Sequence, residues 1–271
     1  MEIVERTKGG VTYLAASGFE AAGGVAHGFS TRLGGVSTGV YESLDLGSTR
    51  GDDPAHVREN YRRFFSAIGG DVGRVALANQ VHGDTVRTVT AADVTRDLFD
   101  PEPYEADGLV TDVPGVALVV FAADCLPILF YDPERRVIAA VHAGWRGTAS
   151  GIVERAVEKM AFYGCDPAHI LAAVGPGISR CCFETHEDVP NAMTAALGVQ
   201  ATPYIDPVEN GKFRVDLKGL NALRLRRAGL LPEHIAVSGD CTMCLPEKYW
   251  SHRATGGVRG SQAAAVQLLP L

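Results

Sequence analysis

Hydrophobic residues recur at the spacing of a helix face in three stretches of the chain. In residues 54–70 they share one face, and Asp53-Pro54 supplies a start signal and Gly69-Gly70 a stop signal. This face consists of Val57, Tyr61, Phe64, Phe65 and Ile68. The same pattern, each time with a glycine stop, predicts helices over residues 148–164 and 216–230. A fourth helix is expected near residues 187–198.

Continuous apolar runs between these helices indicate buried strands. Several runs are apolar on both faces, which is typical of sheets that are covered on both sides. The runs lie at residues 115–124, 127–132, 137–142, 169–175 and 234–239. Helices and strands mix without a regular βαβ period, and the chain has neither a dinucleotide fingerprint nor a P-loop. The pattern predicts an α+β (mixed α/β) fold, with mixed sheets flanked by helices, in a single domain spanning residues 1–271.

Two of the apolar runs are joined by a short turn and should form an antiparallel hairpin. Asp132 followed by Pro133 is typical of a type I turn. If Asp132 faces Arg135, then Cys125 faces His142, with Cβ atoms about 4.5–5.5 Å apart on the same face. A loop with an odd number of residues would instead shift the register by one and place the pair on opposite faces.

Composition and charge narrow the classes of function. The chain has 46% hydrophobic and 21% charged residues, as expected of a globular protein, and a formal net charge of -7. This charge argues against a broad nucleic-acid-binding surface but leaves room for a local basic pocket for an anionic substrate. We find no signal peptide and no apolar run long enough to span a membrane, and six cysteines do not indicate a disulfide scaffold. We expect a protein of the reducing cytoplasm.

Cys125 and His142 can be interpreted as core residues or as site residues. A strand cysteine usually acts as a small hydrophobe, and a histidine at a strand end is often only hydrogen-bonded. However, Cys125 follows Asp124, and His142 precedes the small residues of AGWRGT, which let the backbone turn and expose Arg146. A basic side chain beside a Cys/His pair is typical of an anion site.

His82 is the third candidate for this site. It follows an apolar run that ends in Asn79-Gln80 and precedes Gly83-Asp84, a mixture typical of a functional loop at a strand end. Together with Cys125 and His142 it gives three N and S ligands and one open tetrahedral position, as in catalytic zinc sites. Such ligands suit zinc or copper better than magnesium or calcium.

Six motifs of the chain closely resemble those of the bacterial YfiH-like family, and they run in order over nearly its whole length. They are NQVHGDTV, ADGLVTD, ADCLPILFYD, VIAAVHAGWRGT, GPGISRCCFE and GDCT. This family was first labelled laccase-domain or polyphenol-oxidase-like and was later assigned as purine nucleoside phosphorylases. The resemblance implies a four-layer α/β/β/α fold, with His82, Cys125 and His142 binding one zinc, or copper, ion.

The resemblance also implies an activity and its partners. The activity would be phosphorolysis of adenosine, inosine, guanosine and methylthioadenosine, together with hydrolytic deamination of adenosine. The partners would be a small nucleoside and phosphate, with no nucleic acid and no membrane, for a monomer or weak homodimer. Candidate contacts to substrate or phosphate are Ser30, Arg32, Gln80 and Arg146. We do not expect His252 in the site, although His252-Arg253 stands where the family has paired arginines.

Several alternatives remain open from the sequence. Cys125 could be the nucleophile of a metal-free hydrolase with His142 as its base. A multicopper oxidase would need many histidines in His-x-His pairs, whereas this chain has eight histidines and no such pair. A module that only binds its ligand would also fit a pocket. The general acid for the leaving purine is not identified, and Asp84 and Asp124 are candidates.

The remaining thiols include Cys241 and Cys244, which form a C-x-x-C motif without a matching second pair. Cys181 and Cys182 could supply partners, but adjacent cysteines are expected to point in different directions. We interpret these thiols as structural or as bystanders.

Overall fold

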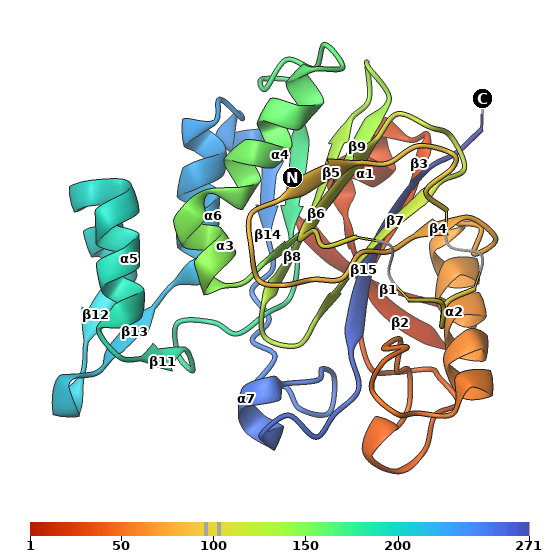
Figure 1. Cartoon of the computed structure of the whole chain (residues 1–271), viewed down its shortest axis with the longest axis horizontal. Coiled ribbons are helices and arrows are strands. Elements are labelled where there is room, and N and C mark those ends of the chain that lie inside the picture. Colours follow the sequence, from red (N-terminus) through yellow and green to blue (C-terminus); the bar gives the residue numbers. More distant parts are fainter. Residues whose placement is uncertain (95–96, 102–103, 271) are drawn as a thin grey trace.

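Two six-stranded mixed sheets pack face to face in this protein, and helices cover their outer faces (Figure 1). The computed structural model describes residues 1–94, 97–101 and 104–270. None of the helices in these ranges is both long enough and apolar enough to cross a lipid bilayer.

The first sheet has the strand order β1-β2-β3-β15-β7-β4. Its neighbours run antiparallel except for β4, which is parallel to β7. The strands are β1 (Ile3–Lys8), β2 (Val11–Ala16), β3 (Val25–Ser30), β4 (Val75–Ala76), β7 (Ala117–Ala122) and β15 (Gln262–Leu268). The C-terminal strand β15 therefore lies between strands from the first half of the chain.

The second sheet has the order β14-β10-β8-β9-β6-β5. Its outer pairs, β10 with β14 and β5 with β6, are parallel, and the other pairs are antiparallel. The strands are β5 (Val86–Thr88), β6 (Gly108–Thr111), β8 (Leu126–Asp132), β9 (Val137–Ala143), β10 (Leu171–Val174) and β14 (Ile235–Val237).

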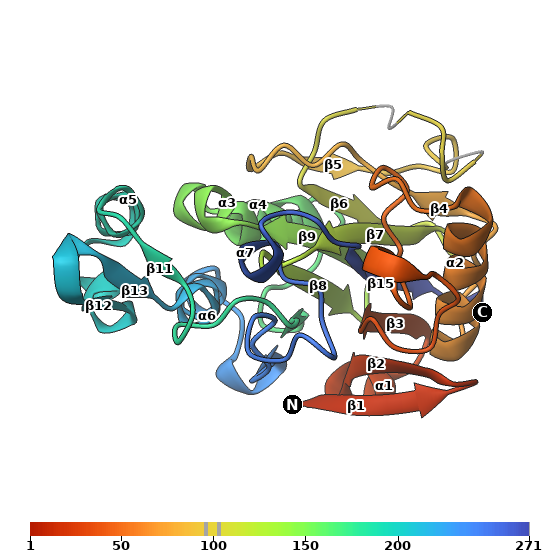
Figure 2. The same ribbon diagram turned by 90° about the horizontal axis from the view of Figure 1, so that it is seen from below.

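A third, small antiparallel sheet lies with α5 at one end of the molecule, as both views show (Figures 1 and 2). It consists of β11 (Glu184–Thr185), β13 (Phe213–Val215) and β12 (Ile205–Pro207). The α-helices are α1 (Ser17–Ala22), α2 (Pro54–Ile68), α3 (Trp145–Ser150), α4 (Ile152–Ala161), α5 (Asp188–Leu197), α6 (Leu217–Arg227) and α7 (His252–Thr255). Short 3-10 helices are η1 (Gly39–Tyr41), η2 (Gly198–Tyr204), η3 (Glu209–Gly211) and η4 (Pro232–His234).

Alternating side chains of the strands build three apolar cores and thereby four layers. In β8, Ile128 and Phe130 pack with residues of α4 and α6, whereas Leu129 and Tyr131 pack against the first sheet. A third core joins the other face of the first sheet to α2. Because a strand presents successive side chains to opposite faces, two stacked sheets need helices on both outer sides. The layers follow the expected helix–sheet–sheet–helix order.

The hydrophobic patterns predicted the helices well. Asp53 caps α2 by accepting a hydrogen bond from the Ala55 amide, and Gly69 ends this helix in the left-handed conformation, as expected. The predicted helix over 148–164 is instead two helices, α3 and α4, because Gly151 adopts a φ of 85° between them.

The predicted register of the hairpin β8–β9 is wrong by two residues. Asp132 pairs with Val137 rather than Arg135, and His142 pairs with Pro127 rather than Cys125. The loop is longer because Arg136 adopts a left-handed φ of 54° before β9 begins. A shift of two residues keeps every side chain on its face of the sheet, so Cys125 still lies on the same side as His142.

Candidate metal centre

His82, Cys125 and His142 come together at one end of the inter-sheet layer. Their ligand atoms all lie within 4.8 Å of one another, and the two imidazole rings stand almost perpendicular, with centroids 4.9 Å apart. His142 is buried at the end of β9, Cys125 is half-buried just before β8, and His82 is exposed on a loop. Two imidazoles and one thiol at this spacing are a donor set that can hold a transition metal and leave one position open.

The buried carboxylate of Asp107 organises both histidines. Its Oδ1 lies 2.8 Å from Nδ1 of His142 and accepts the backbone N–H of His82 at 3.0 Å. Its Oδ2 accepts the N–H groups of Gly83 at 2.7 Å and Val81 at 3.2 Å. Because Nδ1 of His142 is engaged, Nε2 is the nitrogen left for a ligand, as in carboxylate–histidine–metal arrangements.

Backbone conformation near the cluster depends on this carboxylate and on small residues. His82 adopts a left-handed φ of 61°, which is uncommon for a residue with a side chain. A Cβ at Gly144 would lie 3.2 Å from Cδ2 of His82 and 3.3 Å from Sγ of Cys125. A larger residue at position 144 would therefore push the two ligands apart.

The cluster perturbs the acidity of its own members. Burial alone would raise the pKa of Cys125, but the charges and hydrogen bonds of His142 and His82 outweigh it and lower this pKa to about 6. Burial would likewise lower the pKa of His142, yet Cys125 and the Asp107 carboxylate raise it to about 9. A thiolate at neutral pH is the form in which cysteine binds a metal or attacks a substrate.

Two adjoining cavities open onto the cluster, with volumes of about 200 Å³ and about 400 Å³. Both are lined by His82, Cys125, Arg50 and Arg259. The smaller cavity adds mainly polar loop residues and Phe121, and the larger one adds an apolar wall from Ile178 and Phe183. The smaller cavity is lined by all three ligands and the larger one by His82 and Cys125. A polar cavity next to a cavity with one apolar wall suits a substrate with an anionic part and a flat apolar part.

Arg50 and Arg259 bring positive charge to both cavities, and Arg253 adds to it in the larger one. Within the described ranges neither has a carboxylate at ion-pair distance, and Nε of Arg259 is buried without a hydrogen-bond partner. Burial and the neighbouring charge of Arg50 lower the pKa of Arg259 to about 10. Both guanidinium groups face the smaller cavity, whose described lining contains no acid, and this is typical of an anion-binding site.

Asp124 fixes the loop that carries Cys125. Its carboxylate accepts hydrogen bonds from Thr242 Oγ1 at 2.6 Å, from Ser251 Oγ at 3.1 Å and from the Arg253 amide at 2.7 Å. A carboxylate that accepts three hydrogen bonds is suited to holding the loop, which adopts a φ of 89° at this residue. The geometry therefore gives Asp124 a positioning role and does not favour it as the general acid.

Asp84, the other candidate acid, forms an ion pair with Arg155 at 2.9 Å. It lines neither of the two cavities beside the cluster. Its geometry likewise does not favour a role in proton transfer at the site.

The predicted contacts Ser30 and Arg32 lie outside both cavities. Ser30 is fully buried in β3, where its hydroxyl accepts the N–H of Ala263 at 3.0 Å. Arg32 stacks on Trp250, with its guanidinium carbon 3.8 Å from the ring centroid, and donates to backbone carbonyl oxygens. Ser30 therefore joins β3 to β15, and Arg32 stabilises the loops that it contacts.

Of the other two predicted contacts, Gln80 lines the smaller cavity and Arg146 does not line either one. The Gln80 amide exchanges two hydrogen bonds with the backbone of Phe121, at 2.9 and 2.7 Å. Arg146 lies over the ring of Trp145 on the outer surface of α3. The charge expected from Arg146 comes instead from Arg50 and Arg259.

His252, which we did not expect in the site, lies on the wall of the larger cavity together with Arg253. The sequence analysis also missed Asp107, Arg50 and Arg259. The sequence does indicate Asp107. An acidic residue directly before a glycine, at the start of a buried strand, does not suit the apolar core and is therefore a candidate site residue. The two arginines carry only the weak signal of a basic residue in a glycine-rich loop.

The fold and the cluster define a mixed α/β protein in which three N and S donors at the end of two stacked sheets could hold a metal ion. Residues 26–269 match the family described as multi-copper polyphenol oxidoreductase laccase, and the chain belongs to this laccase-like, YfiH family. Two groups of described residues have the spacing to hold a metal, and neither contains more than two histidines.

Relatives of this chain are named purine nucleoside phosphorylases rather than laccases. The chain is 40% identical to a purine nucleoside phosphorylase of Deinococcus radiodurans, over 90% of this chain and 89% of that protein. It is 35% identical to the purine nucleoside phosphorylase YlmD of Geobacillus stearothermophilus, over 90% of each chain. The crystal structure of that YlmD superposes with a TM-score of 0.91 at 32% identity, over 99% of this chain and 100% of the other. The structure of YfiH from Bacillus licheniformis gives a TM-score of 0.90 at 31% identity, covering 97% and 98%.

Replacing Asp107 by Asn should weaken metal binding without removing a ligand. The amide cannot serve as a charged acceptor for His142 and for the loop at the same time, so we expect zinc affinity to fall about 10- to 100-fold. Competition with a chelating dye measures this change. Asp84→Asn is the matched control, since Asp84 forms an ion pair with Arg155 and lines neither cavity. Equal zinc affinity of Asp107→Asn and wild type would contradict the role of Asp107.

Cys125 of the metal-stripped protein should react with iodoacetamide as a low-pKa thiol. Because only the thiolate reacts, the rate should rise with pH through about 6, the pKa that His142 and His82 impose. His142→Ala should move the midpoint upward, toward the value of about 8.5 of an ordinary cysteine. Mass spectrometry of the Cys125 peptide separates this reaction from that of the other thiols. A wild-type midpoint near the ordinary value would show that the cluster does not stabilise the thiolate.

Proposed function

We propose that this protein is a purine nucleoside phosphorylase that depends on a metal held by His82, Cys125 and His142. The names of its relatives support this activity. The observation that carries the proposal is the position of the three ligands beside Arg50 and Arg259 in one pair of cavities. A metal centre and an anion site that share one substrate cavity suit a reaction in which phosphate attacks a nucleoside.

The metal is proposed to be zinc, with copper as a possible substitute. Two imidazoles and one thiolate suit both ions, and Asp107 orients His142 as outer partners of zinc ligands do. When bound, the ion supplies Lewis-acid chemistry and activates an oxygen nucleophile at neutral pH.

The residues of the chain would bind and orient the two substrates. Arg50 and Arg259 would hold phosphate through charge-assisted hydrogen bonds and neutralise its charge as it approaches the ribose C1′. Ile178 and Phe183 would pack against the purine ring in the larger cavity. Binding both partners in fixed positions makes their reaction effectively unimolecular.

The proposed substrates are adenosine, inosine, guanosine and methylthioadenosine, with hydrolytic deamination of adenosine as a second activity. The two reactions attack different atoms, so adenosine would have to bind in two orientations against the same ligands. The apolar wall can accept a purine in either orientation, because stacking does not fix the direction of the ring edge. Phosphate dependence separates the two reactions, since only phosphorolysis consumes phosphate.

A metal-free cysteine hydrolase is the second candidate, and the low pKa of Cys125 beside His142 favours it. In that case exhaustive chelation would leave full activity, and a covalent adduct would form on Cys125. Loss of activity on chelation, with recovery on adding zinc, is what we expect instead.

Cys125→Ala should abolish both turnover reactions of adenosine. The loss of activity should exceed the roughly 10- to 100-fold loss that follows removal of a residue hydrogen-bonded to a metal ligand, because Cys125→Ala removes a ligand itself. Chromatography detects adenine and ribose 1-phosphate, which form only when phosphate is present, and inosine, whose formation does not need phosphate. Cys165→Ala, at a buried thiol of the apolar core, is the control and should keep both activities. Unchanged turnover and metal content in Cys125→Ala would refute the assignment of Cys125 as a ligand of the site.

Arg259→Gln should impair phosphorolysis more than deamination. Loss of a charge-assisted hydrogen bond of about 1.5–3 kcal/mol lowers kcat/KM for phosphate about 10- to 100-fold. Initial rates at varied phosphate, with inosine formation measured in parallel, test this. Arg146→Gln is the matched control, because Arg146 lies on Trp145 outside the cavities. An equal loss of both reactions, or a larger effect at Arg146, would refute the proposed phosphate site.

A further inference from the structure

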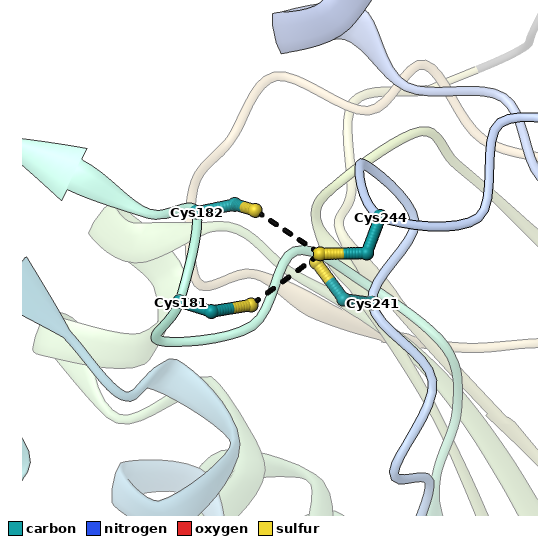
Figure 3. Close-up of side chains that lie close together, drawn as sticks. All are labelled: Cys181, Cys182, Cys241 and Cys244. Carbon is teal, nitrogen blue, oxygen red and sulfur yellow. Dashed lines mark hydrogen bonds between the residues drawn. The ribbon is translucent and has the colours of Figure 1, made fainter.

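Four cysteines outside the candidate metal centre converge from two loops. Cys181 and Cys182 follow β10, and Cys241 and Cys244 follow β14 (Figure 3). Because β10 and β14 are parallel neighbours, the loops after them leave the sheet at the same edge. Our expectation that adjacent cysteines point apart is wrong here, since the sulfurs of Cys181 and Cys182 both point toward Cys244 (Figure 3).

The spacing of the four sulfurs matches a tetrahedral metal site. The Sγ atom of Cys244 lies 3.3 Å from that of Cys182 and 3.6 Å from that of Cys181, and all four lie within 4.8 Å of one another. In a tetrahedral zinc site with Zn–S bonds of about 2.3 Å, neighbouring sulfurs are about 3.8 Å apart. All four cysteines are free thiols in the structure.

The surroundings of Cys241 favour a thiolate, and a buried cation lies near the cluster. The backbone N–H of Ser179 donates to Sγ of Cys241 at 3.3 Å. Lys218 is buried, and its Nζ atom donates to Ser179 Oγ and to the carbonyl oxygens of Ser238 and Asp240. Within the described ranges no carboxylate lies at ion-pair distance from Lys218. Lys218 interacts electrostatically with Cys241 and Cys181, as well as with the carboxylates of Asp240 and Asp216. The net negative charge of a metal bound to four thiolates would add to the balance of this buried cation.

We propose that Cys181, Cys182, Cys241 and Cys244 bind one zinc ion in a closed, structural site, separate from the three-ligand centre. Four thiolates leave no open position, so this site would bind neither water nor substrate. Each cysteine loses its proton when the ion binds. The proposal does not rest on the proposed enzymatic activity.

The site would anchor the wall of the larger cavity. Ile178 and Phe183, which line that cavity, flank Cys181 and Cys182 in the same loop. Thr242, which holds the Asp124 carboxylate at 2.6 Å, lies directly after Cys241. An ion that ties the two loops together would therefore hold the wall and the loop of Cys125 in their observed positions.

Zinc content of the full chain tests the proposal. Protein loaded with zinc alone under reducing conditions, then freed of excess metal, should hold about two ions per chain. The double variant Cys181→Ser/Cys244→Ser, which changes two exposed thiols, should hold about one, and so should Cys125→Ala. Cys165→Ser is the matched control for loss of a thiol and should hold as much zinc as wild type.

Cobalt(II) reports which ligands hold the remaining ion. In Cys125→Ala, cobalt should give the intense charge-transfer and ligand-field bands of a tetrahedral tetrathiolate complex. The single variant Cys181→Ser should weaken and shift these bands, and this readout holds even where the double variant folds poorly.

Three results would overturn the proposal. The first is a zinc content of Cys181→Ser/Cys244→Ser equal to that of wild type. The second is a cobalt spectrum of Cys125→Ala that Cys181→Ser leaves unchanged. The third is a disulfide-linked peptide among these four cysteines in protein isolated with its thiols blocked, because that would make the cluster a redox pair rather than a metal site.

Discussion

The geometry of the candidate metal centre depends on the hydrogen bonds that the Asp107 carboxylate accepts. It is fully buried, and it holds the ring of one histidine and the backbone of the other, which comes from a different loop. A buried carboxylate is costly unless it is paired and hydrogen-bonded, and here four donors satisfy it. The same contacts stabilise the left-handed backbone of His82 and fix the direction of the His142 ring. One side chain therefore sets the geometry of two of the three ligands.

The stacked sheets explain why this centre lies where it does. The inward-facing residues of β9 pack in the core between the sheets up to Ala140, and His142 is the next residue on that face. Cys125 stands on the same side, just before β8 begins. At this end the apolar core gives way to loops, so polar ligands are held by a rigid scaffold and still reach solvent-filled cavities.

Hydrophobic periodicity predicted α2 and α6 because each buries one face against a sheet. It missed β1, which is half-exposed, and β15, whose alanine-rich sequence gives no strong signal. The His82, Cys125 and His142 trio could be proposed because a two-residue error in register preserves the face of a strand, whereas a one-residue error would have separated the pair. Arg50 and Arg259 could not be predicted as a pair, since only the tertiary fold brings such distant segments to one cavity.

The opposite wall of the cavity is built from loops rather than from strands. Strand pairing therefore does not hold it, and other interactions must fix its position. Asp124 connects the loop of Cys125 to Thr242 and Ser251 through hydrogen bonds. The same polar groups form hydrogen bonds with water when the protein unfolds. Such contacts contribute little net stability each, whereas metal–thiolate bonds contribute folding free energy outright. A tetrathiolate ion beside Thr242 would fix this wall in the way that Asp107 fixes the histidines. The two sides of the cavity would then be held by different chemistry, one by a buried carboxylate and the other by a second ion.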